Sequence, residues 1–380
     1  MSGIPQLLKK NIFVEPMKEA NPILPGAEVI YTDGPVSLAY GGSLSEMQIA
    51  FETFGKLSKA KDNVVLLMPA FSAHSHARST EINPSRGWWE DIVGPGLAID
   101  TDKFFVVCAS LLGSCYGTTG PASINPQTEM AYATKFPVVT IRDIMEAHAR
   151  VLDHLEIDQV HAVVGGSMGA MQVLEFAIRH PGRLRRFINI SGTSHTRPYT
   201  AAVRHLGRRA IMFDPAYNDG NYGRVLPVAG LRLAREIGTL FYRSREEFNE
   251  RFDQDPLRAP GLDEIVFDVQ SYLNHQGNKV VVHFDPNSYL YMSMSMDLHD
   301  VGRGFATRDE AFAQIQAEAL TIGIKEDNLI TVDEQRDIHD SILRAGGKST
   351  WLEFSSRVGH DAFLVETDLI TPAIKEFIES

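Results

Sequence analysis

Cysteine is scarce in this sequence, which has only Cys108 and Cys115 among its 380 residues. The chain also lacks a CxxC pair and an HExxH pattern, so we expect no metal site. No uncharged apolar run is long enough to span a bilayer, and the first residues lack the basic start and apolar core of a secretory signal. We therefore expect a cytoplasmic protein with unpaired cysteines, Cys108 in the core and Cys115 in a loop.

Basic residues are also fewer than acidic residues. The chain has 36 Lys and Arg against 48 Asp and Glu, a formal net charge of −12. Nucleic acids and anionic membranes require a basic face, so we expect neither as a partner. Small molecules are the expected partners, and an anionic substrate would need cations gathered locally at its binding site.

Short apolar runs alternate with helical patterns along much of the chain. The runs that we expect to form buried strands are Val64–Met68, Phe104–Ala109, Val160–Val164, Phe187–Ile190 and Ala319–Ile324. Helical patterns at Val139–Leu155 and Met168–His180 flank the third run. This alternation predicts an α/β fold with a mostly parallel, doubly wound sheet.

The alternation stops between residues 197 and 304, where helical patterns dominate. They cover Ala201–Phe213, Gly230–Arg243, Arg245–Phe252, Val269–Gly277 and Ser288–Leu298. We therefore expect one catalytic domain, built from residues 1–196 and 305–380, with a helical lid domain at 197–304 inserted in it.

The strongest local motif is Gly165-Gly166-Ser167-Met168-Gly169, which lies between an expected strand and an expected helix. G-x-S-x-G in this context is typical of the nucleophile turn of the α/β-hydrolase fold. The turn is sharp, so small neighbours are needed around Ser167, the predicted nucleophile. The backbone N–H of Met168 would face a developing oxyanion. The alternative is a glycine-rich turn with an incidental serine.

A nucleophilic serine needs a base and an acid that orients the base, in the order serine, acid, histidine for this fold. We predict His360, which follows the strand-like run Thr350–Phe354, as the base. We predict Asp327 as the acid, because it follows the last expected parallel strand at the edge where active-site loops gather. Asp333 and Glu326 are the nearest competitors, with solvated loop charge as their other interpretation.

The second oxyanion donor is expected in the loop after the first buried strand. That loop begins at Pro69 and makes the backbone N–H of Phe71 our candidate. His74 and His76 follow it, and nothing completes a metal-ligand set around them. We expect both histidines to line or support the mouth of the pocket.

Longer motifs resemble those of the homoserine O-acetyltransferases and their serine O-acyltransferase relatives. They are GWWEDIVGPGLAIDTDKFFVVC, LGSCYGTTGPASINPQT, VVGGSMGAMQ, FDPNSYLYMSMSMD and GHDAFL, and the resemblance runs from about Leu44 to the C-terminus. One departure is Ala170, where family members usually have a second glycine. Its methyl group should be tolerated but should tighten packing beside Ser167.

The resemblance implies a ping-pong reaction without a bound cofactor. Ser167 would accept an acyl group from acetyl-CoA or succinyl-CoA as co-substrate and pass it to an amino-acid hydroxyl. By the family pattern, Arg208 would hold the carboxylate of that amino acid and Asp361 its ammonium group. Arg204 and Arg209 are the alternatives to Arg208, and a solvated basic face is another interpretation of all three. The resemblance also implies a homodimer.

The acceptor and the reaction class stay open. The forms LGSCYGTTGP and NISGTSHTRPY are more similar to the serine branch, which would feed cysteine synthesis, than to the homoserine branch, which would feed methionine synthesis. A deacetylcephalosporin C-type acetyltransferase is a further alternative. An esterase on the same fold would use water in place of the amino acid, and fold alone does not separate the two. A non-catalytic binding protein is a third possibility, which an intact Ser/Asp/His set disfavours.

Overall fold

A computed structural model describes residues 21–257 and 266–380, built around a sheet of eight strands. In spatial order the strands are β1 (Glu28–Tyr31), β4 (Gln48–Phe54), β8 (Phe105–Ala109), β5 (Val64–Met68), β11 (Val160–Gly166), β12 (Leu184–Ile190), β13 (Glu318–Ile324) and β14 (Ser349–Phe354). Neighbours from β8 to β14 run parallel, whereas β4 is antiparallel to both β1 and β8. The mostly parallel sheet is therefore confirmed, and the antiparallel pair β1 and β4 is an addition that the sequence patterns did not indicate.

Helices cover both faces of the sheet. Side chains alternate between faces along a strand, so Leu66 and Met68 of β5 belong to one apolar core while Val65 and Leu67 belong to another. The first core includes α2 (Ile141–His154), α3 (Met168–Arg179) and α10 (Val332–Arg344), and the second includes α12 (Thr367–Glu379). The strands of the parallel part that are buried on both sides, such as β5 and β8, are apolar at every position for this reason.

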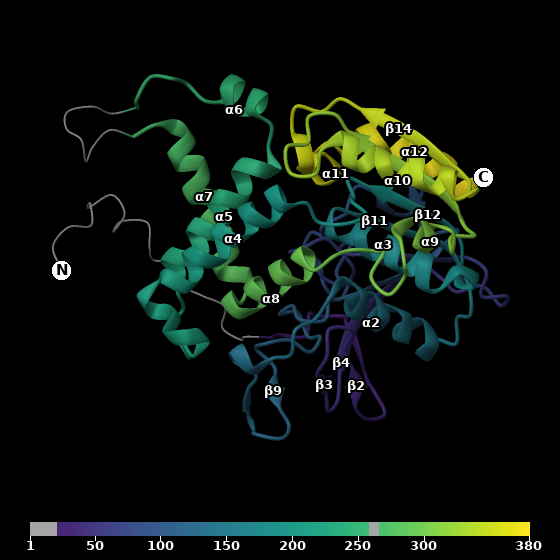
Figure 1. Cartoon of the computed structure of the whole chain (residues 1–380), viewed down its shortest axis with the longest axis horizontal. Coiled ribbons are helices and arrows are strands. Elements are labelled where there is room, and N and C mark those ends of the chain that lie inside the picture. Colours follow the sequence, from purple (N-terminus) through teal and green to yellow (C-terminus); the bar gives the residue numbers. More distant parts are fainter. Residues whose placement is uncertain (1–20, 258–265) are drawn as a thin grey trace.

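Five of the described helices between β12 and β13 lie within residues 197–304, and they gather on one side of the molecule in Figure 1. They are α4 (Pro198–Phe213), α5 (Val228–Tyr242), α6 (Arg245–Arg251), α7 (Asp268–His283) and α8 (Pro286–Asp297). Helix α5 packs against α4 and α7, and α4 also packs against α8. Residues 1–20 of the predicted catalytic domain and 258–265 of the predicted lid lie outside the described residues.

The predicted helix ends were wrong in one informative place. We expected the fourth of these helices to end at Gly277, but α7 continues to His283. A Cβ on Gly277 would lie 2.9 Å from Glu236 Oε1 and 3.2 Å from Arg232 Cβ, both on α5. This glycine permits close helix packing instead of ending the helix.

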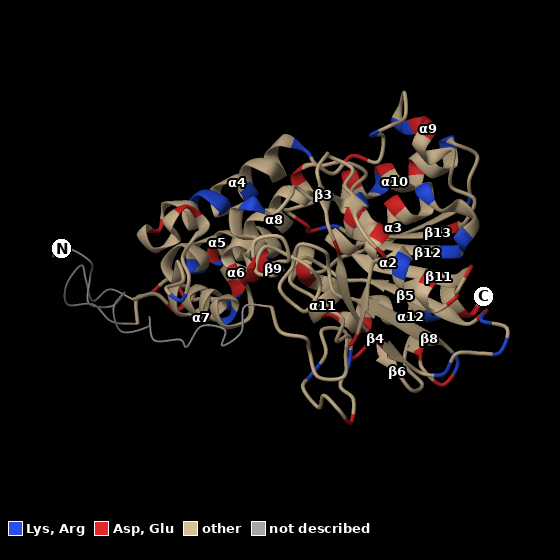
Figure 2. Cartoon of the chain, turned by 90° about the horizontal axis from the view of Figure 1, so that it is seen from below, with Lys and Arg blue, Asp and Glu red and all other residues tan. Residues whose placement is uncertain are grey.

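The cysteine predictions hold. Cys108 lies in β8 and Cys115 in the loop that follows it, and both are buried and unpaired. Across the described ranges, no helix is long and apolar enough to cross a membrane. Acidic and basic residues are interspersed over the helices (Figure 2).

Candidate active site

Ser167 occupies a strained turn between β11 and α3, with φ 57° and ψ −120°. The glycines around it are required by close backbone contact. A Cβ on Gly165 would lie 2.6 Å from the backbone of Gly169, and a Cβ on Gly169 would lie 2.1 Å from the carbonyl oxygen of Met68. Larger side chains would push the turn away from β5, so the G-x-S-x-G spacing follows from packing as well as from backbone strain.

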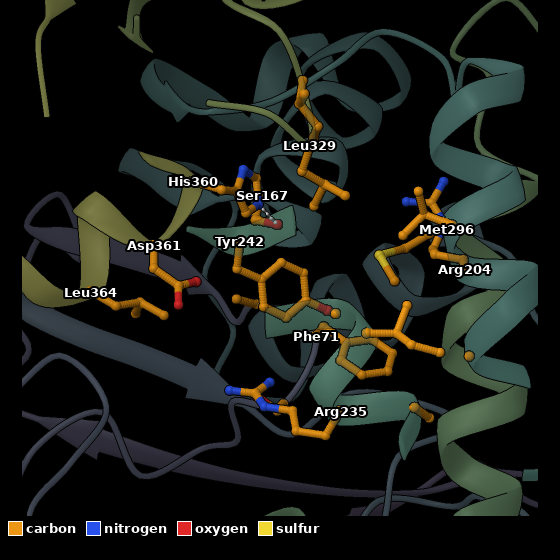
Figure 3. A pocket seen from close by; sticks show the side chains of 18 of the residues that line it. Phe71, Ser167, Arg204, Arg235, Tyr242, Met296, Leu329, His360, Asp361 and Leu364 are labelled. Atoms are coloured by element: carbon orange, nitrogen blue, oxygen red, sulfur yellow. Dashed lines mark hydrogen bonds between the residues drawn. The ribbon is translucent and has the colours of Figure 1, made fainter. Parts of the chain in front are cut away.

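Three side chains predicted from the sequence meet above this turn (Figure 3 shows Ser167 and His360). His360 Nε2 lies 2.7 Å from Ser167 Oγ, and His360 Nδ1 lies 2.6 Å from Asp327 Oδ2. A carboxylate only accepts hydrogen bonds, so Nδ1 carries the proton and Nε2 is free to accept from the serine hydroxyl. This connected set has the geometry that activates a serine as a nucleophile.

The carboxylate of Asp327 is held by four donors. Oδ1 accepts from the backbone N–H groups of Leu329 and Ile330, each at 2.9 Å. Oδ2 accepts from Gln335 Nε2 at 3.0 Å as well as from His360. Gln335 is fully buried on α10, and its Oε1 also accepts from the N–H of Ile324. Sequence reasoning missed Gln335, since nothing in the pattern of α10 distinguishes it from the other polar residues there.

The environment of His360 shifts its protonation equilibrium. Burial lowers the pKa of the imidazole, but the charge of Asp327 and the hydrogen bond to it act the other way, and the net pKa lies above the ordinary 6.5. The ion pair favours the protonated ring that forms when the base takes a proton.

The two alternative acids, Asp333 and Glu326, are not bound to His360. Asp333 is exposed in the first turn of α10. Glu326 accepts hydrogen bonds from Ser355 Oγ at 2.5 Å and from the Ser356 N–H at 2.7 Å. Asp327 is the acid that reaches His360.

The two predicted oxyanion donors lie in the segments that surround Ser167. Met168 is the first residue of α3, and Phe71 lies in the loop after β5, on the wall of the cavity that contains Ser167. Neither backbone N–H donates to another residue in the described part of the chain. The ring of Phe71 is fixed by Phe284 and Tyr289, with ring centroids 5.5 and 5.0 Å away.

The cavity at Ser167 is enclosed by loops of the sheet edge and by helices α4, α5 and α8. Its wall includes apolar side chains such as Met171, Val203, Met296, Leu329 and Phe363. Three charged side chains also line it, Arg204 from α4, Arg235 from α5 and Asp361 beside His360 (Figure 3). The site can therefore hold a small molecule that carries charges of both signs.

Arg208, the predicted carboxylate ligand, is not among the residues that line this cavity. It is buried, with Nη2 2.6 Å from Asp297 Oδ2 and Nη1 2.8 Å from Ser293 Oγ. Arg204 does line the cavity, and its Nε lies 2.6 Å from Asp297 Oδ1. Two guanidinium groups thus share one carboxylate, which leaves one positive charge uncompensated within this cluster. Arg209 is exposed and stacks on Phe213.

Asp361, the predicted ammonium ligand, lines the cavity and forms an ion pair with Arg243. The two atoms, Asp361 Oδ2 and Arg243 Nε, are 3.3 Å apart. Arg243 also binds Glu247, at 3.1 Å, so two carboxylates share it. This arrangement leaves Asp361 able to bind a further cation.

Two smaller expectations concern Ala170 and the histidines. Ala170 is fully buried, and a Cβ on Gly192 would lie 2.7 Å from the methyl group of Ala170, so the glycine makes room for it.

His76 is bound to Glu52 Oε2 at 2.8 Å and to the Ser85 carbonyl at 2.9 Å. His74 and His76 both line a second cavity beside the first.

Comparison with known proteins agrees with this architecture. Residues 63–293 match the model of the alpha/beta hydrolase fold family. A homoserine O-acetyltransferase of Symbiobacterium thermophilum is 41% identical, over 93% of this chain and 94% of the relative. A serine O-succinyltransferase of Litchfieldella anticariensis is also 41% identical, over 91% of this chain and 96% of the relative.

Solved structures with the same fold include an acetyltransferase and an esterase. The homoserine O-acetyltransferase of Bacillus anthracis superposes with a TM-score of 0.85 at 27% identity, covering 94% of this chain and 99% of that one. An esterase superposes with a TM-score of 0.86 at 27% identity, covering 93% and 100%. Taken with the sequence relatives, these matches show that the chain belongs to the α/β-hydrolase fold and, within it, to the acyltransferase family that includes homoserine O-acetyltransferases and serine O-succinyltransferases.

Proposed function

We propose that this acyltransferase moves an acetyl or succinyl group from acyl-CoA to the side-chain hydroxyl of L-serine or L-homoserine. The observation that carries the proposal is the Ser167–His360–Asp327 hydrogen-bonded set, whose Ser167 and His360 line the same cavity as Arg204 and Asp361. The relatives named above support the reaction class. The motif LGSCYGTTGP favours serine as acceptor, and hence a place in cysteine synthesis, with homoserine and methionine synthesis second.

In the first half-reaction, His360 Nε2 accepts the proton of Ser167 while Oγ attacks the thioester carbonyl. The N–H groups of Phe71 and Met168 stabilise the negative charge on the carbonyl oxygen. The C–S bond then breaks, His360 gives its proton to the departing thiolate, and CoA leaves with the acyl group held on Ser167.

In the second half-reaction, the amino-acid hydroxyl gives its proton to His360 and attacks the acyl-Ser167 carbonyl. The bond to Oγ breaks, His360 returns the proton to Ser167, and the O-acyl amino acid leaves. The same base works in both halves because the His360–Asp327 pair is restored after each proton transfer.

We assign recognition of the acceptor amino acid to two groups of charged side chains, one around Asp297 and one around Asp361. We propose that Arg204, at the cavity wall, binds its carboxylate, and that Arg208 supports this site by sharing Asp297 with Arg204. An incoming carboxylate would compensate the extra positive charge of that cluster, and Asp361 would bind the ammonium group. The pairing of Arg208 with Asp297 and Ser293 makes Arg204 the nearer of the two to the substrate.

We further propose that residues 197–304 act as a lid domain over the catalytic domain of residues 1–196 and 305–380. Helices α4, α5 and α8 contribute Val203, Gly238, Tyr242 and Tyr289 to the cavity wall. Such a cover limits the access of water, which favours transfer over hydrolysis of the acyl-enzyme. Exposed apolar side chains on α4 and α5, among them Phe213 and Leu240, are consistent with the predicted homodimer, which light scattering tests.

An esterase is the second candidate, because the esterase structure superposes as well as the acetyltransferase structure does. One assay separates the two. Purified protein is given acetyl-CoA or succinyl-CoA with L-serine, L-homoserine or no acceptor, and thiol release and O-acyl product are followed together. The proposal expects an amino acid to speed thiol release with matching O-acyl product. Hydrolysis that outruns transfer at saturating amino acid would favour the esterase.

A further inference from the structure

A second cavity adjoins the one that contains Ser167. The two cavities share Ser72 and Arg235 as wall residues, so they meet at these side chains. The rest of the second wall comes from the loops after β5 and β8, from α7 and from the chain before β1. These residues are Leu24, His74, His76, Asn83, Ser85, Arg86, Tyr116, Lys279, Val280, His283 and Phe284.

The charged residues that line this cavity are basic, whereas the chain as a whole is acidic. Arg86, Arg235 and Lys279 line it, and no Asp or Glu does among the residues described. Arg86 is paired with Asp91 on the outer surface. Within the ranges 21–257 and 266–380, neither Arg235 nor Lys279 has a carboxylate at ion-pair distance, although Arg235 stacks on Tyr242. In a chain with a net charge of −12, two cations without acidic partners in one cavity indicate an anionic ligand.

His74 contributes shape to the cavity more than charge. Burial and the neighbouring His76 and His283 lower the pKa of His74 to about 4, so His74 is neutral near pH 7. Its ring contacts Tyr116 edge-on at 4.7 Å, and Tyr116 contacts Phe284 at 5.9 Å. These packed rings form part of the cavity wall.

We propose that this basic cavity binds the phosphate groups of the acyl-CoA donor, with Arg235 at the passage between the phosphates and the thioester at Ser167. The inference rests on the proposed function and gives it a donor site. A CoA thioester has its reactive carbon at one end and its diphosphate and 3′-phosphate at the other. The two adjoining cavities match this division, one with the nucleophile and one with the cations. Lys279 contributes a mobile point charge that suits a phosphate.

The test compares two donors in matched variants. Lys279→Glu reverses a charge in the basic cavity, and Lys348→Glu makes the same change directly before β14, outside both cavities. Each protein is assayed with acetyl-CoA and with acetyl-N-acetylcysteamine, a thioester without phosphates. We expect Lys279→Glu to raise the KM for acetyl-CoA at least about tenfold, and to leave acylation by the short thioester within about twofold of the parent. Lys348→Glu should change neither donor.

The outcomes separate the inference from the function on which it rests. An unchanged KM for acetyl-CoA in Lys279→Glu, or an equal loss with both donors, would overturn the phosphate site and leave acyl transfer in place. A wild-type protein that accepts neither thioester would overturn the proposed function itself. Lys279→Met, which removes the charge without reversing it, should give a smaller rise in the KM for acetyl-CoA and serves if the glutamate variant fails to fold.

Discussion

Gln335 Nε2 donates a 3.0 Å hydrogen bond to Asp327 Oδ2, the same oxygen that lies 2.6 Å from His360 Nδ1. Gln335 also binds the Ile330 carbonyl and the Ile324 N–H. One buried amide therefore connects the end of β13, the loop that carries Asp327 and helix α10. It is a positioning residue, since it acts on His360 through Asp327.

Replacing Gln335 with methionine should slow the chemistry without weakening substrate binding. We expect kcat to fall about 10- to 100-fold, because Asp327 loses one of its four donors and holds His360 less accurately. With its charge less dispersed, Asp327 should also raise the pKa of His360 further, so the acid limb of the pH profile moves to higher pH. Gln314→Met, at an exposed glutamine, is the control. An acid limb that stays in place would mean that Gln335 has only a structural role.

The pH dependence of acylation follows from the pKa of His360. The imidazole works as a base only when it is neutral, and the pKa lies above 6.5 because of Asp327. The kcat/KM for acyl-CoA should therefore be lost as the pH falls through a value above 6.5. Asp327→Asn removes the charge that raises this pKa, so its acid limb should lie at lower pH, with turnover reduced by roughly 10⁴. A wild-type midpoint at or below 6.5 would contradict this account.

The acceptor site is tested by comparing Arg204→Ala with Arg208→Ala. Losing one partner of a buried charge pair costs about 2–5 kcal/mol, so Arg204→Ala should lower kcat/KM for the amino acid by roughly 30-fold or more. Acylation by acyl-CoA alone should change much less, because that step does not use the carboxylate site. Arg204→Lys should restore the activity only in part, since a point charge replaces a planar fork.

Arg208→Ala has a different expected profile. Arg208 is bound to Asp297 and Ser293, so its loss should lower thermal stability and acceptor kinetics together. If Arg208→Ala lowers kcat/KM for the amino acid more than Arg204→Ala does, at equal thermal stability, then Arg208 is the residue that binds the carboxylate directly. Both half-reactions and the melting temperature are measured in each variant.

Backbone strain at Ser167 gives a prediction about stability. Its φ of 57° disfavours a side chain and suits glycine. The free energy of unfolding of Ser167→Gly should therefore exceed that of Ser167→Ala by about 1–3 kcal/mol, while both variants are inactive. At Ser295, inside α8, the same pair of substitutions should show the opposite order, because glycine destabilises a helix. Equal stability of the two Ser167 variants would mean that the turn stores no strain.

The sequence predicted β5, β8, β11, β12 and β13 well because each contains a run of consecutive apolar positions, as burial on both faces requires. It also predicted Ser167, Asp327 and His360 as neighbours, since active-site loops in this fold gather at one edge of the sheet. The strands β1 and β4 were missed. β1 is partly exposed at the edge of the sheet, and Glu52 interrupts the apolar pattern of β4 by binding His76.

The side-chain partners of the site could not be predicted. Arg204 and Arg208 are one helical turn apart on α4, so spacing alone places both near the site. The partner that distinguishes them is Asp297, 89 residues further on than Arg208, and its contacts depend on how α8 packs against α4. The basic cavity has the same origin, since Arg86 and Lys279 are brought together only by the fold.

Mass spectrometry of the quenched protein, incubated with acetyl-CoA or succinyl-CoA but no amino acid, tests the central claim most directly. The account predicts one acyl group per chain on the peptide that contains Ser167, formed with a burst of free CoA and absent in Ser167→Ala. Adding the acceptor amino acid should then remove the acyl group and yield the O-acyl product. An unmodified Ser167, together with initial-rate lines that intersect instead of running parallel, would contradict transfer through an acyl-enzyme.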